Sequence, residues 1–579
     1  MGRFSFDSDD ELSEEENLSD LDIMSDGESE HSEHNSETEQ SAADSDDDSD
    51  TDTDTNNNKS VKNKAVNTKY VLGKDKSTRW FSDPPNPKVR TQKHNIVTGL
   101  PGPTKLTKNS KTPKDCWNLF LPAETIEQIV AHTNIFLEKL RSSKKNKTDI
   151  QPTSCVEINA MIGLLYMLGV HKDSRVNLKE LWATDGTAPD CYRALMSISR
   201  FCTLLSVLKF DDINDREERK KVDNLAPIRE FSDSFIERCQ QNYTPGEYLT
   251  IDEMLQAFRG RCKFRQYIAN KPARYGIKIY SMADSKRFYT YNMEIYCGKQ
   301  LPGPHVKSNS AIDVVKRLTA PILNTGRNIT CDNYFTSVPL ANYLLKNKTT
   351  IVGTIRRNKR ELLRELLEIK NRSICSSKFV FTDNSMVVSY IPKKSKNVLM
   401  YSTMHNSASI DNSTGEKMKP EIITFYNKTK AGVDVVDQLQ GDYNVARDTR
   451  RWPMVVFYAI LNIAGINSRI IYEENVGKKI VRREFLRQLF FQLVQPQLVL
   501  RSKLPNLKLE LRSAILKIGN IKPEKQTHVS SRRLCCYCPR RANSYTTKSC
   551  SSCNTPLCNQ HTVRYCTDCD LNLISKDDL

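Results

Sequence analysis

Four aspartates lie in sequence settings that would bring carboxylates together around divalent metal ions. Asp252 ends one strand-like run and Asp332 ends another, while Asp434 and Asp437 are three residues apart, on one face of a predicted helix. Carboxylates gathered from distant elements hold two ions about 4 Å apart in phosphoryl transfer, where one ion activates the attacking oxygen and the other stabilises the leaving oxygen. Mg²⁺ prefers such oxygen ligands. Each motif alone is also compatible with an ordinary cap or turn residue.

Cysteine and histidine residues near the end of the sequence are spaced as zinc ligands are. Of the 17 cysteines, eight fall within residues 535–569. Four pairs with two intervening residues supply eight ligands, enough for two tetrahedral Zn²⁺ ions: Cys535 with Cys538, Cys550 with Cys553, Cys558 with His561, and Cys566 with Cys569. The spacing leaves two pairings open, first with third and second with fourth, or sequential. Zinc would supply much of the folding energy of so small a module.

Basic residues follow the acidic motifs and predict contacts with the phosphates of a nucleic acid. The alternation of Arg259, Arg261, Lys263 and Arg265 would place them on one face of a strand. The other candidates are Lys271, Arg274, Arg356, Arg357, Lys359, Arg447 and Arg451. Trp452 could stack on an unpaired base. The alternatives are a solvated charged surface for the basic clusters and ordinary packing at a helix start for Trp452.

The net charge is unevenly distributed along the chain. The formal charge is +16, but residues 1–54 contain 22 acids and one base, which leaves a net +37 on the other 525 residues. So large a positive excess favours a polyanionic partner, of which nucleic acid is the usual one. The longest apolar run, residues 454–466, is too short to cross a bilayer, and the acidic N-terminus is no secretory signal, so we expect no membrane partner. The cysteine cluster then indicates metal in a reducing compartment rather than disulfides.

The elements that must position these residues predict a mixed α/β protein with several parts. Residues 1–54 cannot bury enough apolar surface to order, and residues 55–115 read as a basic linker. Helical spacing dominates from 116, strand alternation begins at 246, and Pro453 opens a long helix. Residues 421–426 are predicted to return as a strand. The expected parts are 1–115, a disordered acidic tail and basic linker; 116–245, helical; 246–358, strands with helices; 359–420, an insertion; 421–443, the second piece of the strand-rich part; 444–522, helical; and 530–579, the zinc module.

From about residue 116 to 570 the chain resembles the piggyBac transposases and their domesticated derivatives. The acidic blocks are 249–253 (Leu-Thr-Ile-Asp-Glu), 328–337 (Asn-Ile-Thr-Cys-Asp-Asn-Tyr-Phe-Thr-Ser) and 426–434 (Tyr-Asn-Lys-Thr-Lys-Ala-Gly-Val-Asp). Between and after them stand 258–261 (Phe-Arg-Gly-Arg), 270–272 (Asn-Lys-Pro), 275–278 (Tyr-Gly-Ile-Lys), 350–354 (Thr-Ile-Val-Gly-Thr), 451–453 (Arg-Trp-Pro), 461–464 (Leu-Asn-Ile-Ala) and 467–468 (Asn-Ser). Because the blocks occur in order over most of the chain, chance is a poor explanation.

The resemblance implies an RNase H-like catalytic core with an Asp-Asp-Asp triad. Carried over residue by residue, the triad is Asp252, Asp332 and Asp434, holding two Mg²⁺ ions, with Asp437 as a further acid near the site. The core would be interrupted by the insertion at 359–420. The helical segments 116–245 and 444–522 would form one dimerisation and DNA-binding domain, which implies a homodimer. Trp452 matches a family aromatic near the active site.

The resemblance also implies the reaction and the zinc pairing. The reaction is cut-and-paste transposition in the nucleus on double-stranded DNA: water attacks the transposon end, the freed 3′ hydroxyl closes a hairpin, and the reopened ends join a TTAA target. The family's cysteine-rich domain is cross-braced, which pairs Cys535 and Cys538 with Cys558 and His561, and Cys550 and Cys553 with Cys566 and Cys569. That domain recognises transposon ends in the family.

Two alternatives remain open at this point. A domesticated derivative would bind DNA without cutting it, although no triad acid is missing from the sequence. A protein-interaction module of the RING or PHD kind would also use cross-braced zinc. It would not account for the carboxylate blocks or for the +37 body.

Overall fold

A mixed sheet of eleven strands contains Asp252 and the strand that leads to Asp332. The computed structural model describes residues 70–85, 97, 99–143, 150–269, 271–505, 507–522, 532–550 and 555–562. The strands are β1 (Tyr70–Leu72), β2 (Arg79–Phe81), β5 (Tyr248–Ala257), β6 (Gln266–Tyr267), β7 (Tyr275–Asp284), β8 (Thr290–Ile295), β9 (Asn328–Cys331), β10 (Thr350–Thr354), β11 (Ser377–Phe381), β12 (Met386–Lys393) and β13 (Lys396–Ser402). Their order is β1-β2-β11-β12-β13-β10-β9-β5-β7-β6, with β8 also on β7.

Five of these strands form one end of the sheet, in the order β8-β7-β5-β9-β10. The first three in sequence are antiparallel neighbours, and β9 and β10 then run parallel to β5. The long β5 strand is rich in β-branched and apolar residues, which favour a pleated, buried surface; Leu249, Ile251 and Met254 are all at most 1% exposed. Parallel strands are usually buried on both faces, and β9 is buried at all four positions.

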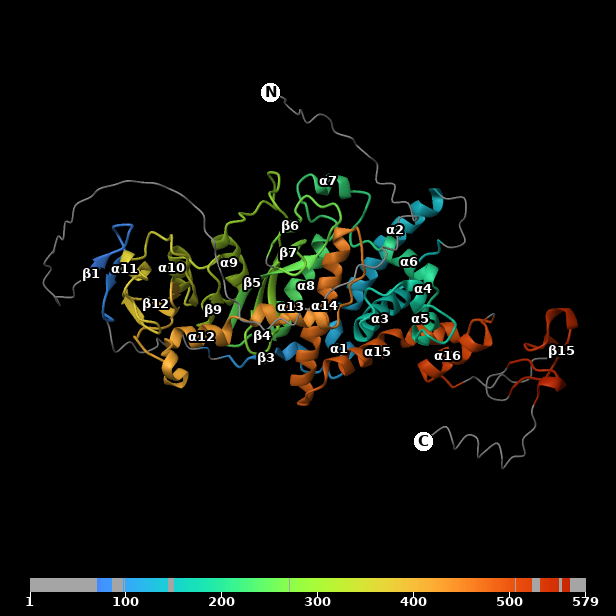
Figure 1. Cartoon of the computed structure of the whole chain (residues 1–579). Coiled ribbons are helices and arrows are strands. Elements are labelled where there is room, and N and C mark those ends of the chain that lie inside the picture. Colours follow the sequence, from blue (N-terminus) through green and yellow to red (C-terminus); the bar gives the residue numbers. More distant parts are fainter. Residues whose placement is uncertain are drawn as a thin grey trace, which may run out of the picture.

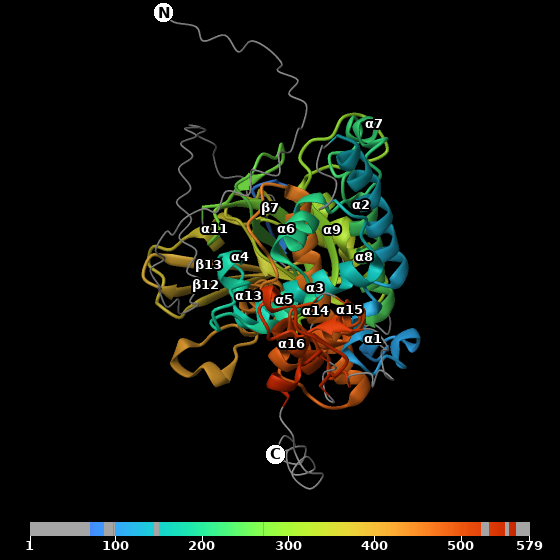
Figure 2. The same cartoon turned by 90° about the vertical axis from the view of Figure 1, so that its right-hand side faces the viewer.

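Helices from both ends of the sequence pack together beside the sheet. The earlier ones are α1 (Pro113–Asn118), α2 (Ala123–Ser143), α3 (Cys155–His171), α4 (Leu178–Leu181), α5 (Asp190–Leu195), α6 (Ile198–Val207), α7 (Arg216–Lys220) and α8 (Arg229–Asn242), and the later ones are α14 (Trp452–Val476), α15 (Arg482–Ser502) and α16 (Leu509–Gly519). Helix α3 packs along α15, and α1 contacts both α14 and α15. Figures 1 and 2 show this helical layer at the end of the protein opposite β1 and β12.

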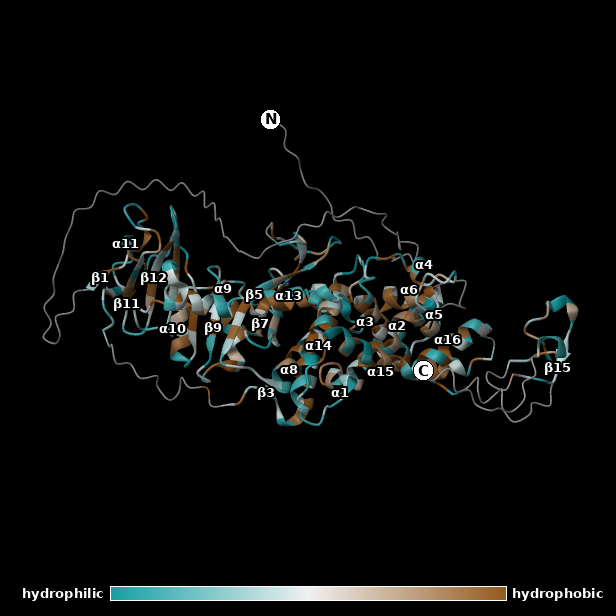
Figure 3. Cartoon of the chain, turned by 60° about the horizontal axis from the view of Figure 1, so that its bottom comes forward, coloured by the Kyte–Doolittle hydropathy of each residue, from teal (hydrophilic) through white to brown (hydrophobic). Residues whose placement is uncertain are grey.

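Close approach and buried hydrogen bonds hold these helices together. A Cβ at Gly163 would lie 2.6 Å from a methyl of Val494, so only glycine lets α3 and α15 approach so closely. The Tyr166 hydroxyl accepts from Trp117 Nε1 at 2.8 Å and donates to the Leu461 carbonyl at 2.7 Å, which links α1, α3 and α14. Apolar residues gather in the interior of this layer (Figure 3). Helix α14 is long and apolar enough to cross a membrane, but 94% of its apolar window is buried, as in the core helix of a globular domain.

Five further helices cover the sheet: α9 (Ala311–Thr319), α10 (Val338–Lys346), α11 (Arg364–Leu367), α12 (Glu421–Thr429) and α13 (Gly432–Asp442). Helix α12 corrects the strand predicted at 421–426. The Ile-Ile-Thr run favours a strand by propensity, but Ile422 and Ile423 are buried, and the apolar pair recurs at Phe425 and Tyr426. Such spacing places both pairs on one helix face, and tertiary packing decides against the local preference.

The predicted linker and insertion also belong to the sheet. Strands β1 and β2 fall within the segment 55–115 that was predicted to be extended, and Trp80 is only 1% exposed, so that part of the prediction is wrong. The acidic residues 1–54 lie outside the described residues. Strands β11, β12 and β13 come from the predicted insertion. Because β13 pairs antiparallel with β10, the insertion continues the same sheet that contains β5 and β9.

Candidate active site and zinc centre

Two of the predicted acids lie side by side where β9 ends next to the middle of β5. In the β5–β9 register, Thr250 lies opposite Thr330 and Ile251 opposite Cys331, so Asp252 and Asp332 are the next residues on the two adjacent strands. Asp332 directly follows β9 as predicted, but Asp252 lies within β5, which continues to Ala257, and does not end its strand. The Asp332 carboxylate accepts hydrogen bonds from the backbone N–H groups of Tyr334 at 2.9 Å and Phe335 at 3.3 Å, which fixes the turn after β9.

The junction between the end of α12 and the start of α13 is anchored to the same two strands. Thr250 donates to the Thr429 carbonyl at 2.5 Å, and Thr330 donates to the Thr429 hydroxyl at 2.8 Å. A Cβ at Gly432 would lie 2.5 Å from the Thr250 hydroxyl, so glycine is required for the helix start to approach β5. Asp434 lies in the first turn of α13, where the helix dipole favours a negative charge. The structure thus brings the third acid close to Asp252 and Asp332.

Lys271 reaches into this group of acids. Its ammonium donates to the Glu253 carbonyl at 2.9 Å and lies 3.9 Å from Asp434 Oδ1. Burial would lower the pKa of Lys271, but the surrounding carboxylates outweigh burial and raise it; in decreasing influence they are Asp252, Asp434, Glu253 and Asp437. Lys271 was predicted to contact DNA, but it is committed to the acids instead. We call Asp252, Glu253, Asp332, Asp434, Asp437 and Lys271 the acidic centre.

Burial and mutual repulsion shift the acids toward their protonated forms. Burial raises the pKa of Asp252 to about 8, with a further contribution from the Glu253 charge, while Lys271 opposes the shift. Burial and Glu253 also raise the pKa of Asp332, and burial raises that of Asp437. Crowded carboxylates of this kind bind either protons or cations. An all-oxygen donor set in a partly buried place fits a hard divalent ion such as Mg²⁺.

The basic residues after β5 do not form the predicted strand face. Strand β5 ends at Ala257, and residues 258–265 turn, because Gly260 packs against the Phe258 ring and the Arg450 carbonyl. Arg265 donates to the carbonyls of Arg259 and Gly260, which closes the turn. The side chains that remain exposed here are Arg259, Arg261, Lys263, Arg265 and Arg274.

The basic residues after β10 begin near the turn that follows β9. Arg356 and Arg357 are exposed and Lys359 is half-buried. The Arg356 guanidinium stands 5.9 Å from the centre of the Tyr334 ring, a cation–π arrangement. This places Arg356 beside the turn that begins at Asp332.

Arg447 and Arg451 bind main-chain carbonyls inside the protein, in contrast to the predicted DNA contacts. Arg447 donates to the carbonyls at positions 173, 174 and 176 at 2.7–3.0 Å. Arg451 donates to the carbonyls at positions 205, 206 and 208. Trp452 packs edge-on against Phe264 with ring centres 5.0 Å apart, as its packing alternative requires. These three residues tie the start of α14 to neighbouring segments.

Sequence reasoning missed two residues of the site. Glu253 follows Asp252, and its carboxylate lies 3.9 Å from the Lys278 ammonium. Tyr334 lies close to two cations, with Lys278 5.1 Å and Arg356 5.9 Å from its ring centre. Both could have been found by their position next to a candidate acid: Glu253 directly follows Asp252, and Tyr334 stands two residues after Asp332.

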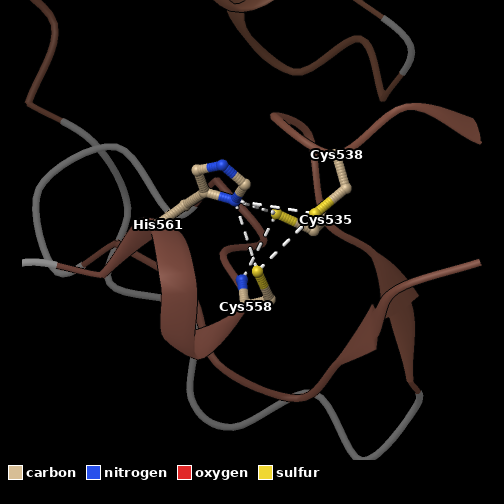
Figure 4. Close-up of side chains that lie close together, drawn as sticks. All are labelled: Cys535, Cys538, Cys558 and His561. Carbon is tan, nitrogen blue, oxygen red and sulfur yellow. Dashed lines mark hydrogen bonds between the residues drawn. The ribbon is translucent and has the colours of Figure 1, made fainter. Parts of the chain in front are cut away.

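Four zinc ligands come together near the C-terminal end of the described chain (Figure 4). The ligand atoms of Cys535, Cys538, Cys558 and His561 all lie within 4.8 Å of one another, and within the described residues no other group of three or more candidate ligands is so compact. The sulfurs of Cys538 and Cys558 are 3.7 Å apart, and His561 Nδ1 lies 3.3–3.6 Å from the three sulfurs.

These distances fit a tetrahedral zinc ion. Zn–S bonds near 2.3 Å separate two sulfurs by about 3.8 Å at the tetrahedral angle. The backbone N–H of Cys558 also donates to Cys535 Sγ at 3.3 Å, which favours the thiolate that zinc requires. The set joins the first pair with the third. Of the second predicted set, Cys553, Cys566 and Cys569 lie outside the described residues, and Cys536 is exposed and not a member of the group.

Comparisons with known proteins agree with this architecture. The model of the DDE transposase family described as Transposase IS4 matches residues 112–469. A solved piggyBac transposase, determined by cryo-EM in a synaptic complex with hairpin DNA, superposes with a TM-score of 0.72 at 38% identity, covering 81% of this chain and all of that chain. PiggyBac transposable element-derived protein 3 of Homo sapiens is 22% identical over 366 residues, which is 59% of this chain and 58% of that protein. The chimeric ERCC6-PGBD3 protein of Homo sapiens matches equally well over 32% of its length. The aligned region thus spans less than two thirds of these curated relatives.

The fold and the matched family define the class first: a transposase with a DDE domain, for which divalent metal ions are implied. Within that class, the chain belongs to the piggyBac family of transposases.

Proposed function

We propose that this protein cuts and joins DNA at the acidic centre as a cut-and-paste transposase. The observation that carries the proposal is the convergence of Asp252, Asp332 and Asp434. The first two come from adjacent parallel strands, and the third comes from the first turn of α13. The strand order β8-β7-β5-β9-β10 supports an RNase H-like core. Asp252, Asp332 and Asp434 would hold two Mg²⁺ ions, with Asp437 as an additional acid one helix turn away.

The chain's own residues prepare this centre for phosphate chemistry. When bound, Mg²⁺ would activate the attacking oxygen and stabilise the leaving one. Arg356 and Lys278, 5.9 Å and 5.1 Å from the Tyr334 ring centre, would neutralise the negative charge of a DNA strand that enters beside Asp332. The bonds of Thr250 and Thr330 to Thr429 fix the end of α12 just before α13 begins, so that Asp434 does not have to be reorganised during reaction.

The remaining parts have proposed roles in the same reaction. The substrates are double-stranded transposon ends, which pass through hairpins, and TTAA target sites. The solved neighbour in a synaptic complex with hairpin DNA supports the hairpin step. The zinc module, with a second zinc ion on Cys550, Cys553, Cys566 and Cys569, recognises the ends. The helical layer supports a homodimer, and a protein that works on genomic DNA would act in the nucleus.

One assay tests the proposal directly. Purified full-length protein, Mg²⁺ and DNA carrying the ends of the matching element should yield nicked strands and then hairpin ends on a denaturing gel. Omitting Mg²⁺ should stop both. Tight binding of these ends without nicking in Mg²⁺ would contradict the proposal and favour a DNA-binding derivative without cleavage.

Lys271 provides a prediction about metal binding. Lys271→Met should strengthen Mg²⁺ binding about tenfold, because the ion no longer competes with an ammonium 3.9 Å from Asp434. The metal-free variant should also melt at a lower temperature, because its crowded acids lose their counter-ion. Titration calorimetry and thermal unfolding measure the two effects. Lys263→Met, at an exposed position of the turn after β5, is the matched control and should change neither. Unchanged Mg²⁺ affinity in Lys271→Met would show that the Lys271 ammonium does not compete with Mg²⁺ for the same carboxylates.

The raised pKa of Asp252 makes Mg²⁺ binding depend on pH. Below a pKa of about 8, Asp252 carries a proton that the ion must displace, so Mg²⁺ affinity should rise as pH increases toward 8 and level off above it. In the metal-free protein the sign is opposite for stability, because a raised carboxyl pKa gives stability that is lost as pH rises through that value. Calorimetry in buffers of different ionisation enthalpy should show proton release at neutral pH that vanishes at high pH. Constant proton release would contradict the prediction.

A further inference from the structure

A hairpin far from the acidic motifs in sequence lies against the loop that follows β10. Strands β1 and β2 pair antiparallel with Val71 opposite Trp80, and β2 joins β11 through Phe81 and Phe381 (Figure 1). We call residues 70–81 the N-terminal hairpin and residues 355–363 the basic loop. The basic loop carries four cations: Arg356, Arg357, Lys359 and Arg360.

The N-terminal hairpin donates four hydrogen bonds to main-chain carbonyls of the basic loop. They are Lys74 N to Leu362 O (3.2 Å), Asp75 N to Arg360 O (2.8 Å), Trp80 Nε1 to Glu361 O (2.7 Å) and Lys74 Nζ to Arg357 O (3.1 Å). Three consecutive carbonyls of the loop, at positions 360–362, are therefore bound by groups about 280 residues earlier in the chain. Within the loop, backbone N–H groups donate to the carbonyls of Arg356 and Lys359, whereas the carbonyls at 360–362 accept from the N-terminal hairpin.

The turn of the N-terminal hairpin is shaped for this contact. The Asp75 carboxylate accepts from the backbone and hydroxyl of both Ser77 and Thr78, at 2.6–3.1 Å. Burial alone would raise the pKa of Asp75, but these bonds lower it to about 2, so the turn stays intact at physiological pH. A Cβ at Gly73 would lie 2.5 Å from the Glu361 carbonyl oxygen, which makes glycine necessary where hairpin and loop touch.

The basic loop connects this contact to the acidic centre. Its first residue, Ile355, donates to the Leu399 carbonyl at 3.0 Å, so β13 holds one end of the loop and the N-terminal hairpin holds the other. Arg356 lies between, over the Tyr334 ring, and its charge favours the ionised form of Asp332. The position of the Arg356 guanidinium therefore depends on both anchors.

We infer that the N-terminal hairpin is a positioning element of the active site, which holds the basic loop so that Arg356 and its neighbours meet the phosphates of bound DNA. The inference rests on the proposed function for its DNA part. A loop that is ordered before binding loses less conformational entropy when DNA arrives, which strengthens binding without adding a contact. The N-terminal hairpin touches no reacting atom, so its effect is exerted entirely through the loop.

Hydrogen exchange in the full-length protein tests the positioning step without DNA. Gly73→Val inserts a side chain against Glu361, and Trp80→Phe keeps an aromatic ring but removes the Nε1 donor. Both should speed amide exchange at Lys74, Asp75 and residues 355–363 by about tenfold, with exchange in β5 unchanged. Leu72→Thr, on an exposed hairpin position, is the matched control. Wild-type exchange in the basic loop of both variants would overturn the inference.

DNA affinity tests the functional step. On a duplex of mixed sequence without Mg²⁺, Gly73→Val and Trp80→Phe should weaken binding about as much as Arg356→Gln does, and all three should flatten the dependence on salt. Faster loop exchange with wild-type DNA affinity would overturn the role of the hairpin in DNA binding. If the wild-type protein binds no DNA, the proposed function fails, while the exchange result still decides whether the N-terminal hairpin positions the loop.

Discussion

Asp332→Asn is expected to abolish strand cleavage and hairpin formation, with a loss of at least about a thousandfold, while DNA binding is retained. Asparagine keeps a side-chain oxygen for the N–H groups of Tyr334 and Phe335, so the turn after β9 should survive. It removes the negative charge that a metal ion needs. Because burial and Glu253 raise the pKa of Asp332, neutralising it should leave the metal-free protein at least as stable as the wild type.

The informative measurements are cleavage rate, DNA affinity and melting temperature on the same preparations. Asp383→Asn, an exposed aspartate in the turn between β11 and β12, is the matched control and should behave as wild type in all three. Residual cleavage within tenfold of wild type would remove Asp332 from the metal site and, with it, the proposed reaction. A large drop in melting temperature would instead assign Asp332 to the fold.

Part of the acidic centre could be predicted because Asp252 and Asp332 stand in or next to short strand-like runs of sequence. Residues 248–257 and 328–331 alternate or run apolar as strands do; Asp252 lies within the first run, and Asp332 directly follows the second. The two acids meet because β5 and β9 pair in parallel with Ile251 opposite Cys331, a register that the sequence alone does not specify. The sequence could not specify that Thr250 and Thr330 both bind Thr429, and these bonds decide where Asp434 lies.

The errors share a physical cause, which is partners distant in sequence. Arg447 and Arg451 have the composition of DNA contacts, but carbonyls more than 240 residues away bind their guanidinium groups. Trp80 stands in a polar stretch with no periodicity, and it is ordered by a carbonyl 281 residues away. The local composition of a segment indicates how much conformational entropy is lost when the segment becomes ordered. Long-range hydrogen bonds such as these supply free energy that offsets this loss.

Cys558→Ser is expected to remove one zinc ion per chain and to unfold the zinc module. Cys558 contacts each of the other three ligands: its Sγ is 3.7 Å from Cys538 Sγ and 3.3 Å from His561 Nδ1, and its N–H donates to Cys535. Within the described residues, β14 (Arg533–Leu534) and β15 (Tyr545–Thr546) pair only with each other, a sheet too small to be stable in water. We expect a zinc ion at this cluster to supply the missing free energy, which is of the order of 10 kcal/mol for structural sites.

The neighbouring Cys536 makes the experiment selective. Cys536→Ser changes an exposed thiol two residues from Cys538 and outside the ligand group, so its zinc content and module fold should match the wild type. Because the central sheet and α14 have their own buried core, Cys558→Ser should leave the main unfolding transition in place. It should lose selective binding of transposon ends yet keep non-specific DNA binding. Equal zinc content in the two variants would contradict the ligand assignment, whereas loss of zinc with intact end recognition would show that the module serves another partner.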